Sequence, residues 1–133
     1  MNYLEPTFTE AELARLSNLA LAHVGDGVFE LMTRVYLAAQ GRETARGLHR
    51  ATVQLVNAPS QAKMIERLLP RLTEEELTIF RRGRNARVGS VPKAASVKEY
   101  HEATGLEALF GWLYLKGERA RLEALFALAM EEN

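Results

Sequence analysis

The segment Val24-Gly25-Asp26-Gly27-Val28-Phe29-Glu30 places acidic side chains inside a long, mostly apolar stretch of the chain. A second placement of this kind occurs far downstream, where Glu107 lies within Gly105-Leu106-Glu107-Ala108-Leu109-Phe110-Gly111-Trp112. An ionised carboxylate in apolar surroundings is costly unless a cation or hydrogen-bond donors compensate it. Two such acids on separate helices of one small domain therefore predict a shared cation.

The spacing of apolar residues around Asp26 is helical. One helix is expected from Leu19 to Gln40, with Gly41 as its stop. Gly25 and Gly27 lower helix propensity, which predicts the close approach of a backbone or ligand beside Asp26. The helix is expected to be apolar on the face with Val24, Val28, Leu31 and Val35, and ionisable on the face with His23, Asp26, Glu30 and Arg34.

Helical patterns with capping signals cover most of the remaining chain. Helices are expected after Thr9, over 44–55, over 59–69, from Thr73 to Arg82 or Arg84, over 97–115 and over 118–131, with a loop of about ten residues before Val97. No segment shows strand alternation, repeats or a linker. We therefore predict one all-α domain over residues 1–133.

The composition is that of an ordinary soluble globular protein, with 133 residues, 47% hydrophobic and 26% charged. No apolar run approaches the roughly 20 residues of a membrane helix, so no membrane partner is expected. The chain has no cysteine, and its N-terminal segment lacks a basic start and apolar centre. These features predict a cytoplasmic protein without disulfides or thiolate zinc sites.

The net charge of zero conceals a basic segment. No acid occurs between Glu76 and Glu99. Such a cluster on a neutral protein favours a directed polyanion site, because arginine forks match phosphate geometry. The plain alternative is a solvated loop with incidental charge. The candidate residues for binding a polyanion are Arg81, Arg82, Arg84, Asn85, Arg87 and Lys93 first, with Arg50 and Lys63 second.

Each acid also has a plain alternative. Asp26 is a good N-cap for a helix that begins at Gly27, and Glu30 is placed to pair with Arg34 at i+4. Glu107 has no basic residue within a turn, so its partner must come from elsewhere in the fold. Oxygen ligands without cysteine or paired histidines favour Mg²⁺, or Mn²⁺, over zinc.

The motifs resemble a known family. Residues 18–34 resemble the signature helix of ribonuclease III, and residues 104–114 resemble its second acidic motif. The middle of the chain is similar to the shorter Mini-III branch, which lacks a double-stranded-RNA-binding domain. The matching segments there are Leu48-His49-Arg50-Ala51-Thr52, Gln61-Ala62, Arg81-Arg82-Gly83-Arg84-Asn85-Ala86 and Val91-Pro92-Lys93.

This resemblance implies an all-α ribonuclease III-type endonuclease domain that forms a two-fold homodimer. It implies a metal-dependent endoribonuclease that cuts double-stranded RNA to give 5′-phosphate and 3′-hydroxyl ends. A role in maturing the ends of the 23S ribosomal RNA precursor is expected. Asp26 and Glu107 are then the catalytic residues that hold Mg²⁺ or Mn²⁺, and Glu30 is a further candidate ligand.

The chain departs from full-length ribonuclease III at Ala22 and Thr104, where that enzyme has additional acids. Each site therefore has two of the usual four carboxylates, as in the Mini-III branch, and fewer anionic ligands leave more water on the metal. Two rival interpretations remain: a non-catalytic helical RNA-binding or ribosome-associated module, and a metal-dependent phosphohydrolase acting on nucleotides.

Overall fold

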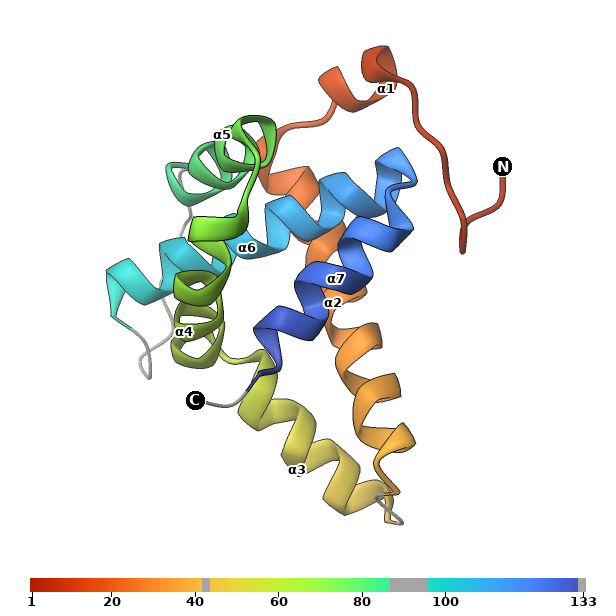
Figure 1. Ribbon diagram of the computed structural model, residues 1–133, viewed down its shortest axis with the longest axis vertical. Helices are drawn as coiled ribbons and strands as arrows, with labels where there is room; N and C mark the ends of the chain where they lie inside the picture. The colour runs from red at the N-terminus through yellow and green to blue at the C-terminus, as the bar shows by residue number, and fades with distance from the viewer. Residues whose placement is uncertain (42–43, 87–95, 132–133) are drawn as a thin grey trace.

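Helices form all the regular secondary structure in residues 1–41, 44–86 and 96–131, which are the residues described by the computed structural model (Figure 1). This confirms the all-α prediction. In chain order the helices are α1 (Glu10–Ala14), α2 (Asn18–Ala39), α3 (Ala45–Val56), α4 (Ala58–Leu68), the 3-10 turn η1 (Leu69–Arg71), α5 (Glu74–Arg84), α6 (Val97–Lys116) and α7 (Arg119–Ala129).

The helix boundaries follow the predicted capping signals to within one or two residues at most ends. Thr9 and Thr73 form capping boxes with Glu12 and Glu76, so that backbone N–H groups at these helix starts are satisfied. Gly41, which directly follows the C-cap of α2, has a φ of 83°, a conformation that favours glycine. Helix α5 ends at Arg84, one of its two predicted ends, and residues 87–95 of the loop expected before Val97 lie outside the described residues.

Helices α2 and α6 form the most extensive contact of the fold and cross in its middle (Figure 1). Two glycines allow their backbones to touch. A Cβ atom on Gly25 would lie 1.6 Å from the carbonyl oxygen of Glu107, and one on Gly111 would lie 2.0 Å from that of Leu21. The predicted close approach is therefore confirmed for Gly25, whereas a Cβ on Gly27 would meet nothing within 4 Å.

An aromatic cluster fills the space between α2, α6 and α7. The rings of Phe29 and Phe110 meet edge to face with centroids 5.5 Å apart, and Phe126 packs on Phe29 at 5.9 Å. Leu109 and Leu125 beside them are fully buried. Such edge-to-face packing adds to the burial of apolar area, so α7 is held firmly against the crossing of α2 and α6.

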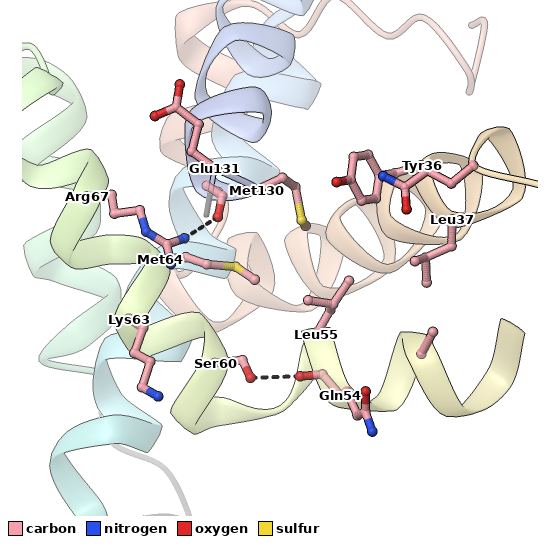
Figure 2. Close-up of a pocket in the computed structure, with 13 residues that line it drawn as sticks. Tyr36, Leu37, Gln54, Leu55, Ser60, Lys63, Met64, Arg67, Met130 and Glu131 are labelled. Carbon is pink, nitrogen blue, oxygen red and sulfur yellow. Dashed lines mark hydrogen bonds between the residues drawn. The ribbon is translucent and has the colours of Figure 1, made fainter. Parts of the chain in front are cut away.

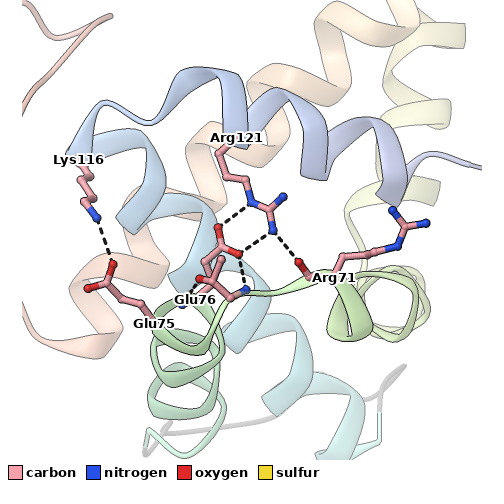
Figure 3. A network of polar contacts seen from close by, with 6 residues as sticks. Arg71, Glu75, Glu76, Lys116 and Arg121 are labelled. Atoms are coloured by element: carbon pink, nitrogen blue, oxygen red, sulfur yellow. Dashed lines mark hydrogen bonds and ion pairs between the residues drawn. The ribbon is translucent and has the colours of Figure 1, made fainter.

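A partly buried ion pair joins α7 to the start of α5 (Figure 3). The Arg121 Nε and Nη2 atoms each donate to Glu76 over 2.8 Å, and Nη2 also donates to the carbonyl of Arg71. The hydrogen bonds from Arg121 hold the pKa of Glu76 below its usual value. This bidentate arrangement fixes the N-terminus of α5 against α7.

The apolar face predicted for α2 is only partly covered. Val28 is buried and Val24 half-buried, but Leu31 and Val35 are 54% and 60% exposed in the monomer. The C-terminal half of α2 extends past α6 towards α3 (Figure 1), and Leu31 and Val35 belong to this half of the helix. None of the described helices is long and apolar enough to cross a membrane.

The glycine contact predicts opposite effects for two neighbouring substitutions. Gly25→Ala should lower the free energy of unfolding by about 3 kcal/mol or more, because its methyl group meets the α6 backbone, which cannot rotate away. Gly27→Ala should raise it by up to about 1 kcal/mol, since alanine favours the helix and has open space there. Denaturant unfolding followed by circular dichroism at equal protein concentrations measures both values. Equal effects of the two variants would contradict the close packing of α2 on α6.

Candidate active site

The structure brings Asp26 of α2 and Glu107 of α6 together. The close packing of Gly25 against the Glu107 carbonyl carries the adjacent Asp26 to the α6 surface. The two acidic side chains are within hydrogen-bonding reach of each other, and the charge of Asp26 acts directly on Glu107. Two residues that are far apart in the sequence thus form one acidic pair.

The surroundings of the two acids differ. Glu107 is half-buried, and burial together with the neighbouring charge of Asp26 raises the pKa of Glu107 to about 8. Asp26 is exposed, so the apolar surroundings expected for both acids are found only at Glu107. Asp26 also lies in the middle of α2, which begins at Asn18, so the alternative of an N-cap for a helix starting at Gly27 is wrong.

A third polar residue, Gln61 of α4, completes this group. It is 3% exposed, and its amide interacts with the Glu107 carboxyl and partly offsets the rise of the pKa there. Its Nε2 atom is buried without a hydrogen-bond partner of good geometry in the described part of the chain. Sequence reasoning did not assign Gln61 to the site. The available signal was a polar residue at helical spacing from the apolar residues Met64, Ile65 and Leu68.

The donor set fits a hard divalent cation. Burial and the neighbouring charge of Asp26 keep Glu107 protonated at neutral pH, and a divalent ion between the two carboxyls would compensate their charge. Carboxylate oxygens are the ligands that Mg²⁺ and Mn²⁺ prefer. No cluster of three or more acidic, histidine or cysteine side chains occurs among the described residues. An ion held here would therefore keep several water or substrate oxygens among its ligands.

Two small buried side chains stand where the ribonuclease III resemblance predicts additional acids. Ala22 and Thr104 are both buried close to the α2–α6 contact. The Thr104 hydroxyl donates to the Tyr100 carbonyl of its own helix over 3.0 Å. Neither residue adds a charged oxygen to the acidic pair.

Glu30 forms an ion pair with a basic residue of its own helix. Its carboxylate lies 3.0 Å from the Arg34 guanidinium, and the side chains of Glu30 and Arg34 are 41% and 59% exposed. This is the i+4 pair expected as its plain alternative, and such solvated pairs contribute little to stability. A role of Glu30 as a metal ligand stays a prediction.

The arginine cluster ends close to the acidic pair. Gly83 of α5 packs on α6, where an added Cβ would lie 2.6 Å from the Ala108 side chain and 3.3 Å from the Thr104 carbonyl. The last turn of α5 therefore lies against the part of α6 that carries Glu107. Arg81, Arg82 and Asn85 are exposed there, and Arg84 lies over the Phe80 ring at 5.6 Å and donates to Asn85. Arg87 and Lys93 lie outside the described residues.

The two second-rank basic residues lie on other helices. Arg50 is exposed on α3, and Lys63 is exposed on α4, two residues after Gln61. Lys63 lines a hollow of about 360 Å³ between α2, α3, α4 and α7, beside Arg67 (Figure 2). The Arg67 Nη1 atom donates to the Ala129 carbonyl over 2.6 Å and so ties α4 to the end of α7. The structure does not bring Arg50 or Lys63 into contact with the acidic pair.

Comparison with known proteins gives a consistent picture. The Ribonuclease III domain model matches residues 19–118, a range that contains Asp26, Gln61 and Glu107. A Mini-ribonuclease 3 from Thermoanaerobacter sp. (strain X514) is 41% identical, and the match covers 98% of this chain and 94% of that protein. A Mini-ribonuclease 3 from Clostridium tetani is 37% identical over 96% of this chain and 85% of its own length.

A solved structure agrees with these matches. The crystal structure of a Fusobacterium nucleatum protein superposes with a TM-score of 0.81 at 30% identity, covering 89% of this chain and 94% of that one. The predicted family resemblance is thus confirmed over nearly the whole chain. The chain belongs to the ribonuclease III family, within its Mini-ribonuclease 3 branch, and is an endoribonuclease.

Proposed function

We propose that this endoribonuclease cuts double-stranded RNA with a divalent ion, Mg²⁺ or Mn²⁺, held by Asp26 and Glu107. The observation that carries the proposal is the convergence of these two carboxyls from α2 and α6, with the pKa of Glu107 raised to about 8. Two adjacent carboxyls without a cation lower the stability of a small domain. Binding of a divalent cation would account for their presence.

Each group in the site has a distinct task in this proposal. Asp26 and Glu107 hold the ion from two different helices and fix its position relative to the protein backbone. When bound, the ion supplies an activated water and stabilises the charge that develops on the phosphodiester. The arginines at the end of α5 bind neighbouring phosphates, together with Arg87 and Lys93 of the adjoining segment. Since A-form RNA presents phosphates and 2′-hydroxyls, recognition is mainly of shape.

The proposal extends to a homodimer acting on a duplex. The exposed Leu31 and Val35 on α2 support it, because uncovered apolar side chains on a core helix are typical of interfaces. A two-fold dimer presents two equivalent sites to the two strands of a duplex. The products carry 5′-phosphate and 3′-hydroxyl ends, and the substrate is the cytoplasmic precursor of 23S ribosomal RNA, in keeping with the Mini-III resemblance.

Removing either carboxylate should abolish cleavage but preserve binding. Asp26→Asn and Glu107→Gln should each lower kcat on labelled duplex RNA with Mg²⁺ by on the order of 10³-fold, equivalent to about 4 kcal/mol. Duplex affinity, measured by filter binding, should change little. Glu74→Gln, which removes an exposed acid on α5, is the matched control and should cut normally. Cleavage that survives Asp26→Asn would exclude Asp26 from the mechanism. A loss of kcat in Glu30→Gln equal to that in Asp26→Asn would identify Glu30 as a further metal ligand.

Metal affinity should depend on pH through Glu107. Because the pKa of Glu107 is about 8 without metal, binding an ion must release a proton below that pH. The apparent affinity for Mg²⁺ should thus rise about tenfold per pH unit towards pH 8 and level off above it. Isothermal titration calorimetry in buffers of different ionisation enthalpy measures both the affinity and the proton release. Proton release near zero at pH 7 would show that Glu107 is already ionised in the free protein.

The arginine cluster should control the salt dependence of RNA binding. Replacing Arg81 or Arg82 with Gln should weaken duplex binding and lower the slope of log affinity against log salt by about one for each phosphate that the variant no longer neutralises. Arg15→Gln, an exposed arginine after α1, is the matched control. An unchanged slope in the α5 variants would remove these residues from the RNA interface.

A further inference from the structure

Gln61 is a buried polar residue that has no role in the proposed chemistry. It lies on α4 and is only 3% exposed, and Ala62, Met64 and Ile65 of the same helix are also buried. Its Nε2 atom makes no hydrogen bond of good geometry with any described residue. A buried donor that is left unsatisfied costs about 1–3 kcal/mol, so this placement calls for an explanation.

The surroundings of Gln61 identify the acceptor. Its amide interacts with the Glu107 carboxyl across the α4–α6 contact. A carboxylate offers several lone pairs on two oxygens, and an N–H donor to it forms a charge-assisted bond of about twice the usual strength.

The backbone around Gln61 is held firmly, as a positioning role requires. Asn57 caps α4 by accepting from the Ser60 N–H over 2.9 Å, and Pro59 stands in the first turn. The Gln61 N–H donates to the Asn57 carbonyl over 3.0 Å. The amide therefore projects from the first turns of a well-capped helix, where a small rotation would carry it away from Glu107.

The composition of the site makes such a donor valuable. In the proposed site Asp26 and Glu107 are the two principal carboxylates, and Ala22 and Thr104 stand where the ribonuclease III resemblance places further acids. With four acids, an ion is held from several directions, whereas with two its position depends on how each one is oriented. Neighbours that orient a ligand commonly change metal affinity or activity by 10–100-fold when removed.

We propose that Gln61 is a positioning residue that donates from Nε2 to the Glu107 carboxylate and fixes the orientation in which Glu107 holds the divalent ion. This inference rests on the proposed function. It assigns α4 a part in the site in addition to α2 and α6. Gln61 acts through Glu107 and contacts neither the ion nor the RNA.

The test compares Gln61→Met and Gln61→Glu with wild type. Methionine keeps the length and lacks the donor, so the dissociation constant for Mg²⁺, measured by calorimetry without RNA, should rise about tenfold. On duplex RNA, kcat should fall while KM stays unchanged. Gln61→Glu keeps the oxygen but loses the donor, and it should not restore kcat. Thr33→Val, a fully buried polar-to-apolar change on α2, should lower the melting temperature without altering metal affinity.

A wild-type measurement covers the case in which Gln61→Met does not fold. The side-chain NH₂ signals of Gln61 in a ¹⁵N-labelled sample should shift on addition of Mg²⁺ with the same dissociation constant as in calorimetry. They should remain unshifted in Glu107→Gln. Unmoved signals in wild-type protein that binds Mg²⁺ would overturn the inference.

The remaining outcomes separate this inference from the proposed function. Wild-type affinity and kcat in Gln61→Met would overturn the positioning role and leave the metal site intact. Full activity in Gln61→Glu would overturn it in favour of an oxygen ligand. Wild-type protein that binds no Mg²⁺ would overturn the proposed function, and the inference with it.

Discussion

The contact between the backbones of α2 and α6 determines the rest of the structure. Gly25 and Gly111 let the helices approach to a distance that no side chain would permit. That approach sets Asp26 beside Glu107 and brings Phe29 of α2 against Phe110 of α6. Helices α4 and α5 both pack on α6 as well. The same glycine pair thus serves both the hydrophobic core and the chemistry.

The acidic pair lowers the stability of the folded protein. Burial and mutual repulsion disfavour ionisation of Glu107, and the free protein responds by keeping it protonated near neutral pH. Other interactions offset this loss of stability. One of them is the bidentate ion pair between Glu76 and Arg121, which holds α5 against α7. Functional sites are commonly less favourable for folding than the scaffold that carries them.

Much of the fold could be predicted from local sequence. The helices follow apolar periodicity, and Thr9, Thr73 and Gly41 mark their ends because capping depends on near neighbours. The exposure of Asp26, Leu31 and Val35 could not be predicted. Periodicity identifies the apolar face of a helix, but it does not show which residues of that face are buried by other helices. Gln61 was missed for a related reason: its contact with Glu107 exists only after α4 packs on α6.

The exposure of Asp26 has a consequence for how a polymer reaches this protein. A site at the bottom of a closed channel admits only a chain end, which must be threaded in. Here one of the two acids stands on the open flank of α2, next to a glycine with free space around it. The exposed acid can therefore be reached from the side of a long molecule, without threading of its end, which is the approach that cleavage of internal bonds requires.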